Sequence, residues 1–600
     1  MRNNRDGETE HESVNCYPMN LLDALELLNR PIPKPASEQG IFLECGFTPL
    51  HLKTFLAAHL RLCFPKDRIE IKTGLYGDLA GNLERVQPSG RSAVCVVVEW
   101  ADLDPRLGIR SLGGWRSTDV PGIVESARRQ SERLTHLMQK LADSVPICVS
   151  TPTLPLPPIF TTQGGQAHHH ECQLRGIVAS LATSLSADRR VRLLNLQRLD
   201  ELSPLGRRFD AKAEITSGFP YTLEQASTLA ELLAALIQDG PPKKGLITDL
   251  DDTLWAGILG EIGVEGITWD MAGHAQMHGV YQQFLASLAS AGVLLAAASR
   301  NDPALVEQAL GRSDLLLSKD SLFPREVHRG PKSESVGRIL DTWNIGPEDV
   351  IFIDDSPMEV AEVHAVFPQM ECVVFPKGDD QAIWNLLRRL RDCLGKGSVS
   401  PEDQIRQRSI RAASTMKSIL PQRGLGADDF LRNVEATITF GLGTDASDDR
   451  ALELINKTNQ FNLNGKRFSH SDWLGLLQDP AAFLLTASYE DKFGPLGKIA
   501  VVVGKREGRK LHVKSWVLSC RAFSRRIEHQ CLKYLFEKFD PEEMVFDYEA
   551  TPRNGPLQDF FAELLGGPPA PSLSVRKAGF DAKAPALFHR LVEAANARAG

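Results

Sequence analysis

The chain has 600 residues, of which 42% are hydrophobic and 24% are charged, the composition of an ordinary globular protein. Its length exceeds what one hydrophobic core organises, so we expect two to four domains. The formal net charge of −8 argues against a nucleic-acid-binding surface, and no apolar run approaches the ~20 residues of a membrane span.

The ten cysteines are scattered at irregular spacings, without a Cys-x-x-Cys pair. This pattern favours reduced thiols over a disulfide framework or a zinc ribbon. The first residues are polar and charged and lack the apolar core of a signal peptide. We therefore expect a cytoplasmic protein that binds neither nucleic acid nor a membrane.

Residues 1–40 form a polar lead-in with one short apolar patch, Leu21–Leu28. From Ile41, strand-like apolar runs alternate with longer helical patterns, which is typical of an α/β layer with a mostly parallel sheet. An amphipathic stretch at 222–238 predicts the helix that closes this first domain, assigned to 41–240. The expected strands are 41–44, 93–99, 145–150 and 191–194.

Residues 241–395 repeat the alternation more compactly and predict a second α/β domain. Pro303 and Pro357 come shortly after two of its strands, where the first turn of a helix accepts proline. The expected strands are 246–248, 293–298, 315–317, 350–353 and 372–375.

After a linker at 396–427, the order of elements changes in residues 428–600. An early helix precedes three consecutive strands, a further helix and a strand, which indicates an α+β domain. The turn at 505–510 has hairpin chemistry. The expected elements are helix 449–458, strands 482–489, 497–505 and 510–518, helix 524–539 and strand 544–548. The whole chain is thus predicted to be an α/β multidomain protein.

Acidic residues cluster where two of the apolar runs stop. The first run ends in Asp249, Asp251 and Asp252, and a later one ends in Asp354 and Asp355. Crowded carboxylates require protons or a cation to offset their repulsion. Because the carboxyl ends of parallel strands meet at one edge of a sheet, these acids can share a hard divalent cation, most naturally Mg²⁺.

Three further residues suit a phosphoryl ligand. Thr253 follows the first acids, Ser299 ends another predicted strand, and Lys332 precedes a helix and can offset negative charge. Each residue alone has a structural explanation, since Asp-Asp pairs are often helix caps. In this order, however, they resemble the motifs of the haloacid-dehalogenase (HAD) superfamily of phosphotransferases.

The HAD resemblance implies that Asp249 is the nucleophile that forms an aspartyl-phosphate. Asp251 would be the general acid and base and would lend its backbone carbonyl to Mg²⁺. The implied metal site comprises Asp249, Asp251, Asp354 and Asp355, with Glu359 nearby. The implied phosphoryl-binding residues are Thr253, Ser299, Arg300 and Lys332.

Several separated motifs narrow the resemblance to the FkbH-like family, in HAD subfamily IIIC. They are Trp255–Ile267 with its regularly spaced glycines, Ser299–Asp302, Phe352–Glu359, Leu454–Leu463 and Trp516–Arg521. The resemblance covers most of residues 243–565. It implies an enzyme that dephosphorylates 1,3-bisphosphoglycerate and loads the glyceryl unit onto an acyl carrier protein, for polyketide-type biosynthesis.

The third domain resembles a GNAT-type acyltransferase. Cys520 is the candidate thiol that would accept the acyl group, because nearby arginines favour a thiolate. The string Arg521–Arg526 lacks both glycines of the coenzyme A loop, so we expect a docking surface for the carrier-protein arm instead. The expected binding residues are Asn456, Lys457, Asn459, Arg521 and Arg525.

The first domain resembles an SGNH hydrolase in its α/β alternation only. Glu44–Thr48 stands where Gly-Asp-Ser is expected, and no Asp-x-x-His follows, so we expect a non-catalytic domain. Other interpretations remain open: a phosphatase or acyl-loading enzyme for another small phosphate ester, or a non-catalytic scaffold that binds carrier proteins. The intact acids argue against the scaffold.

Overall fold

The computed structural model describes residues 19–594, apart from 33–34, 36, 88–91, 113–114, 398, 401–402, 404–405, 408–409, 412–426, 447, 493, 520–521 and 524. The chain separates into two compact units. The first comprises Met1–Gly240 and Ser469–Asp472, and the second comprises Pro241–Phe468 and Trp473–Gly600. Within the described ranges, no helix combines the length and apolarity needed to cross a membrane.

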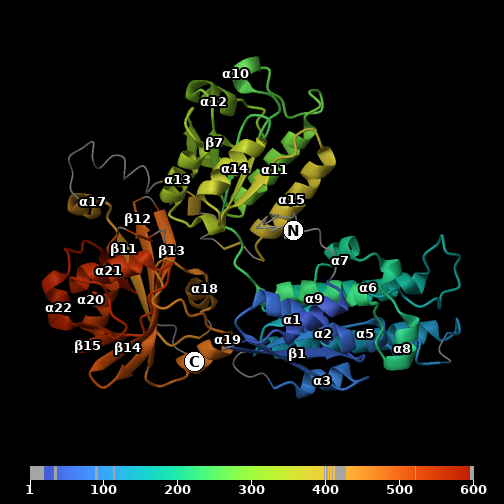
Figure 1. Ribbon diagram of the computed structural model, residues 1–600. Coiled ribbons are helices and arrows are strands. Elements are labelled where there is room, and N and C mark those ends of the chain that lie inside the picture. The colour runs from blue at the N-terminus through green and yellow to red at the C-terminus, as the bar shows by residue number, and fades with distance from the viewer. Residues whose placement is uncertain are drawn as a thin grey trace, which may run out of the picture. The chain divides into compact units, whose positions relative to one another are not determined.

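The first unit contains a five-stranded parallel sheet in the order β2-β1-β3-β4-β5. Figure 1 shows β1 with helices α2 and α9 on one side and α3 on the other. Because side chains alternate along a strand, Val94 and Val96 of β3 face one layer of helices, and Cys95 and Val97 face the other. Helices α3, α5 and α6 cover the first face, and α2 and α9 cover the second. Burial on both faces explains why these strands are apolar throughout.

The strands of this unit are β1 (Glu38–Cys45), β2 (Arg68–Thr73), β3 (Ser92–Val97), β4 (Ile147–Ser150) and β5 (Val191–Leu193). Its helices are α1 (Leu21–Asn29), α2 (Leu50–Cys63), α3 (Leu79–Arg85), α4 (Trp100–Leu103), α5 (Val120–Ala142), α6 (His169–Ser186), α7 (Leu196–Leu202), α8 (Ala211–Ser217) and α9 (Leu223–Gln238).

A buried carboxylate ties together the loops of the first unit. Glu99 follows β3 and is 3% exposed. Its oxygens accept hydrogen bonds from the Thr153 hydroxyl at 2.6 Å and the Tyr221 hydroxyl at 2.7 Å. They also accept from the backbone amides of Thr153 and Leu154. Burial raises the pKa of Glu99, although all of these donors oppose the shift.

The second unit begins with another parallel sheet, in the order β10-β9-β6-β7-β8. Helices α11, α12 and α15 pack on one face, and α13 and α14 on the other. The strands are β6 (Gly245–Thr248), β7 (Leu294–Ser299), β8 (Leu322–Val327), β9 (Val350–Asp354) and β10 (Glu371–Val374). The helices are α10 (Leu259–Ile262), α11 (Gln276–Ser290), α12 (Pro303–Leu310), α13 (Lys332–Trp343), α14 (Pro357–Val366) and α15 (Asp380–Leu394).

The strand predicted at 315–317 is wrong, since Leu316 and Leu317 form a bend and the edge strand is β8. The apolar run is explained by the burial of Leu317 in the core, while Leu316 is 46% exposed. The amide of Leu316 donates to Gln282 Oε1 rather than to a neighbouring strand. The apolar run at 315–317 therefore contributes a side chain to the core although it does not join the sheet.

The rest of the second unit is built on a seven-stranded sheet of mixed direction, in the order β16-β15-β14-β13-β12-β11-β17. Gly508, with φ +60°, allows the tight turn that joins β13 to β14, so the predicted hairpin is confirmed. The strands are β11 (Thr437–Gly443), β12 (Ala482–Asp491), β13 (Gly494–Glu507), β14 (Lys510–Leu518), β15 (Glu543–Phe546), β16 (Leu573–Arg576) and β17 (Arg590–Glu593). The helices are α17 (Ala427–Asn433), α18 (Asp449–Lys457), α19 (His470–Leu477), α20 (Ile527–Phe539), α21 (Gly555–Leu565) and α22 (Lys577–Lys583). Together, the three sheets confirm the predicted α/β multidomain class.

We predict that Glu99→Ala destabilises the first unit by roughly 3 kcal/mol or more, because it leaves several buried donors without an acceptor. Hydrogen exchange measured by mass spectrometry will detect this as faster exchange in peptides that contain β3 and the loop after β4. Glu125→Ala, at an exposed position of α5, is the control and leaves exchange unchanged. Unchanged protection in Glu99→Ala would contradict the assigned role.

Candidate active site

Two acids lie side by side where β6 and β9 end. The parallel register pairs Thr248 with Ile353, so the next residues of the two strands, Asp249 and Asp354, are neighbours. The Asp249 amide donates to the Ile353 carbonyl at 2.9 Å and fixes this arrangement. Asp249 is 5% exposed and Asp354 is fully buried. Strand pairing alone therefore brings two buried carboxylates together.

A buried lysine lies among these carboxylates. Lys332 is the first residue of α13 and is 2% exposed. Its Nζ lies 2.8 Å from Asp249 Oδ1 and 2.6 Å from Glu359 Oε2, and it also contacts Asp354 Oδ2. The ammonium group thus forms ion pairs with three carboxylates that come from a loop, a strand and a helix.

Burial and charge act in opposite directions on these groups. Burial raises the pKa of Asp249 to about 7 and that of Asp354 to about 6, although the Lys332 ammonium counteracts both shifts. Burial opposes the charged form of Lys332, but the carboxylates of Asp249 and Asp354 outweigh it and raise its pKa. The lysine therefore stays charged, and the site holds more carboxylates than one cation neutralises.

The donor set fits a hard divalent cation. Asp249, Asp354 and Glu359 each offer an oxygen, and these oxygens lie within 4.8 Å of one another. Arg300 also pairs with Glu359, and its second partner is Glu362, so four carboxylates and two cationic side chains leave a formal charge of −2, which Mg²⁺ would balance. Oxygen ligands of this kind are those that Mg²⁺ prefers. These residues can therefore hold the cation that the sequence implied.

The position of Asp355 differs from the sequence-based expectation. Its carboxylate lies 2.7 Å from Lys377 Nζ, and the same ammonium group lies 2.9 Å from Asp252 Oδ2. Consecutive residues at a strand end point to opposite sides, so Asp354 and Asp355 cannot both face the same point. Glu359, from the first turn of α14, takes the third place around Lys332 instead.

Asp251 is held by two side chains to which the sequence analysis gave no role. Its Oδ1 accepts from Trp255 Nε1 at 3.0 Å, and its Oδ2 accepts from Asn301 Nδ2 at 2.9 Å. Burial raises the pKa of Asp251, and these two donors moderate the shift. The third acid, Asp252, has φ +49° and accepts from the Gly257 amide, so it shapes the turn.

The other three predicted phosphoryl-binding residues, Thr253, Ser299 and Arg300, lie in different environments. Ser299 ends β7 and is 4% exposed. Thr253 is fully buried, and its hydroxyl has no hydrogen-bond partner among the described atoms. Arg300 is turned towards α14, where it pairs with Glu359 at 3.1 Å and Glu362 at 2.8 Å. Its guanidinium group therefore already has two carboxylate partners.

Most of the described candidate residues from the predicted third domain, which lies in the second unit, make structural contacts. Cys520 and Arg521 lie outside the described residues. The Asn456 side chain exchanges two hydrogen bonds with the backbone of Phe468, and Asn459 accepts from Arg467. Arg525 is buried, lies 3.7 Å from Asp491 and covers the Tyr489 ring. Lys457 pairs with Glu453 at 2.7 Å but remains 52% exposed.

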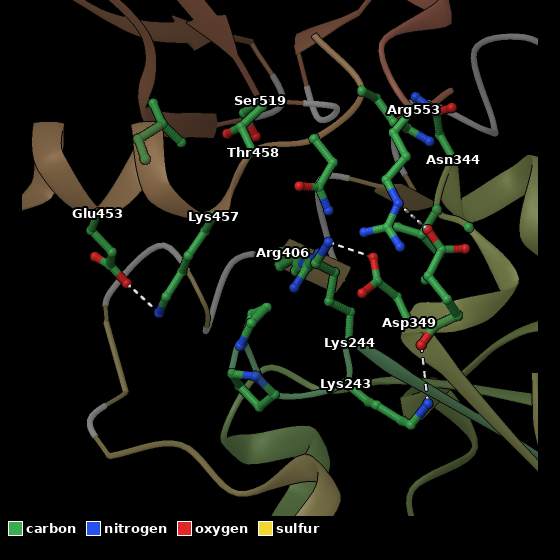
Figure 2. A pocket seen from close by; sticks show the side chains of 18 of the residues that line it. Lys243, Lys244, Asn344, Asp349, Arg406, Glu453, Lys457, Thr458, Ser519 and Arg553 are labelled. Carbon is green, nitrogen blue, oxygen red and sulfur yellow. Dashed lines mark hydrogen bonds and ion pairs between the residues drawn. The ribbon is translucent and has the colours of Figure 1, made fainter. Parts of the chain in front are cut away.

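Lys457 and Asn459 also line a pocket of about 700 Å³ in the second unit (Figure 2). Basic side chains outnumber acidic ones in its described lining, by seven to four. Six of the seven pair with carboxylates, as Lys244 does with Asp349 at 2.6 Å, but the numerical excess of basic side chains still favours an anionic ligand. The basic residues are Lys243, Lys244, Lys396, Arg406, Arg450, Lys457 and Arg553, and the acidic ones are Glu348, Asp349, Asp403 and Glu453.

Comparisons with known proteins identify similarity to a solved structure. No protein-family model and no curated protein matches the chain. Among solved structures, the chain is similar to the N-terminal part of protein BF1531 from Bacteroides fragilis, which contains a phosphatase domain and is complexed with Mg. The identity is 17% and the TM-score 0.50, with 62% of this chain and 98% of the other covered. At this identity, the likeness establishes a shared fold.

We predict that Glu359→Gln weakens Mg²⁺ binding about tenfold or more, because it removes one of three carboxylates that share the cation site. Asp355→Asn, four residues earlier, has a much smaller effect, because its carboxylate faces Lys377. Isothermal titration calorimetry of the full chain with MgCl₂ measures both. A larger loss in Asp355→Asn than in Glu359→Gln would contradict this ligand set.

Proposed function

We propose that the chain is a Mg²⁺-dependent phosphatase or phosphotransferase of the HAD type. The observation that carries this proposal is the cluster of Asp249, Asp354 and Glu359 around the buried Lys332, with Asp251 two residues after Asp249. The phosphatase domain and bound Mg of the structural relative are consistent with it. A scaffold gains nothing from clustered acids, whose repulsion destabilises the fold.

In this mechanism, a carboxylate oxygen of Asp249 attacks the phosphorus, and the bond from phosphorus to the leaving oxygen breaks. Asp251 donates a proton to that oxygen and later accepts one from the water that hydrolyses the aspartyl-phosphate. Trp255 and Asn301 fix the orientation of Asp251 between these two steps. Lys332 offsets charge on the phosphoryl oxygens, and bound Mg²⁺ would add to this neutralisation.

The finer proposal is that the phosphate ester is part of 1,3-bisphosphoglycerate and that the glyceryl unit passes to an acyl carrier protein. Its support is the resemblance of the motifs at 255–267, 454–463 and 516–521 to the FkbH-like family. The basic pocket beside Lys457 and Asn459 suits the phosphate of a carrier-protein arm. A thiol would displace phosphate from the acyl phosphate, forming a thioester, and Cys520 is the candidate.

We predict that Asp249→Asn lowers phosphatase activity at least about 1,000-fold, because an amide oxygen is a poor nucleophile. The measurement is phosphate release from small phosphate esters, including 1,3-bisphosphoglycerate, with Mg²⁺ present. Asp252→Asn is the matched control, since Asp252 shapes the turn and contacts Lys377 rather than Lys332. Activity that survives in Asp249→Asn would refute the nucleophile assignment.

The loading step is tested separately. Incubation with 1,3-bisphosphoglycerate and a holo carrier protein should yield a glyceryl thioester on the carrier, detectable by mass spectrometry. Cys520→Ala should abolish this product and the acyl-enzyme while phosphate-ester hydrolysis continues. If hydrolysis occurs but no thioester forms on any carrier, the phosphatase proposal stands and the loading proposal fails. An acyl-thioester trapped on Cys520→Ala would exclude Cys520.

A further inference from the structure

A second cavity, of about 920 Å³, lies wholly within the first unit. Its wall includes Gly46 after β1, Glu99–Leu103 after β3 and Leu154–Pro158 after β4. The order β2-β1-β3-β4-β5 reverses between β1 and β3, because the chain adds β2 on one side of β1 and β3 on the other. Open α/β sheets bind ligands at this reversal, beyond the carboxyl ends of the strands. The cavity is therefore where this topology places a ligand.

The walls of the cavity are mostly apolar. Leu79 and Ala80 come from the start of α3, Trp100 and Leu103 from α4, and Leu154 from the loop after β4. The Trp100 indole is held in place by donating to the Leu154 carbonyl at 2.8 Å. Pockets of this size with apolar walls and a few polar groups are typical small-molecule sites.

The charges that line the cavity nearly cancel. Three arginines and four acids contribute, namely Arg110, Arg129, Arg133, Asp78, Glu99, Asp102 and Glu214. Arg110 pairs with Glu214 at 3.1 Å, and Arg133 pairs outside the lining with Glu84 at 2.8 Å. The Glu99 carboxylate already accepts hydrogen bonds from the hydroxyl groups of Thr153 and Tyr221. A charged ligand would lose its hydration without gaining a matching excess of opposite charge.

Asp102 provides a polar group next to the loop after β1. Its Oδ2 accepts from the Glu99 amide at 2.7 Å. A Cβ atom at Gly46 would lie only 1.7 Å from Asp102 Oδ1, so glycine is what leaves room for this carboxyl group. A serine nucleophile at position 46 would displace Asp102, and burial strongly raises the pKa of the neighbouring Cys45 thiol. This loop therefore favours binding over hydrolysis.

Exposed apolar side chains lie beside residues that line the cavity. Tyr76 is itself part of the lining and is 52% exposed, and its neighbour Leu75 is 63% exposed. Ile215 follows the lining residue Glu214 and is 65% exposed. Leu112 and Trp115, with exposures of 90% and 41%, line a smaller hollow that shares Ile109 and Ser111 with the cavity. Apolar exposure of this extent marks interaction sites.

We propose that this cavity binds an uncharged organic molecule that has an apolar body and one hydroxyl or amide group. The apolar walls bury the body, and the polar group hydrogen-bonds to Asp102. The near balance of the lining charges disfavours a net anion or cation as the ligand. The site belongs to the first unit and does not depend on the proposed phosphatase chemistry.

The test compares three eight-carbon ligands on the full chain by isothermal titration calorimetry: octanamide, octanoate and octylammonium. Octanamide should bind saturably at one site and more tightly than either charged ligand. Gln130→Trp, which places an indole on the α5 wall of the cavity, should weaken octanamide binding at least about tenfold. Glu132→Trp, an exposed position of the same helix outside the lining, should leave it unchanged.

Three results would overturn the proposal. The first is tighter binding of octanoate or octylammonium than of octanamide, which would show that charge governs recognition. The second is equal binding by wild type and Gln130→Trp, which would place the ligand elsewhere. The third is the absence of saturable octanamide binding to a chain whose circular dichroism and thermal unfolding are normal.

Discussion

The ammonium group of Lys332 is surrounded by three carboxylates, two of them buried, and the candidate active site depends on this arrangement. Pairing of β6 with β9 forces Asp249 and Asp354 together at the sheet edge, where water no longer screens their repulsion. Helix α13 begins at this point, so its first side chain can enter the cluster. The lysine permits two acidic strand ends to share an edge, and the surplus negative charge makes the same place suitable for Mg²⁺.

Two further cationic side chains engage the acids around this cluster. Lys377 pairs with Asp252 and Asp355, which do not contact Lys332, whereas Arg300 pairs both with Glu359 of the cluster and with Glu362. Asp249 and Asp354 pair with Lys332 instead, and in the proposed mechanism Asp249 is the nucleophile. The Asp251 carboxylate instead accepts hydrogen bonds from two neutral side chains, Trp255 and Asn301. It can therefore change protonation state without breaking an ion pair. This division of roles is what a step with both a nucleophile and an acid requires.

The parts of the fold that sequence reasoning predicted are those that local patterns determine. Apolar runs marked the strands, acids marked their carboxyl ends, and Pro303 and Pro357 marked the first turns of α12 and α14. The choice between Asp355 and Glu359 was not predictable, because it depends on where each side chain points after the strand ends. The structural role of Glu99 was not predicted, because its hydrogen-bond partners Thr153 and Tyr221 lie far along the chain. The prediction of a strand at 315–317 was wrong, because an apolar run that is buried in the core can belong to a strand or to an irregular segment.

The central claim is that Asp249 becomes phosphorylated during turnover. Quenching the enzyme with borohydride while it hydrolyses a phosphate ester in the presence of Mg²⁺ reduces an aspartyl-phosphate to homoserine, which peptide mass spectrometry locates. We predict homoserine at position 249 alone, and only when substrate is present. Continued turnover with Asp249 unmodified, or with the label at another residue, would contradict it.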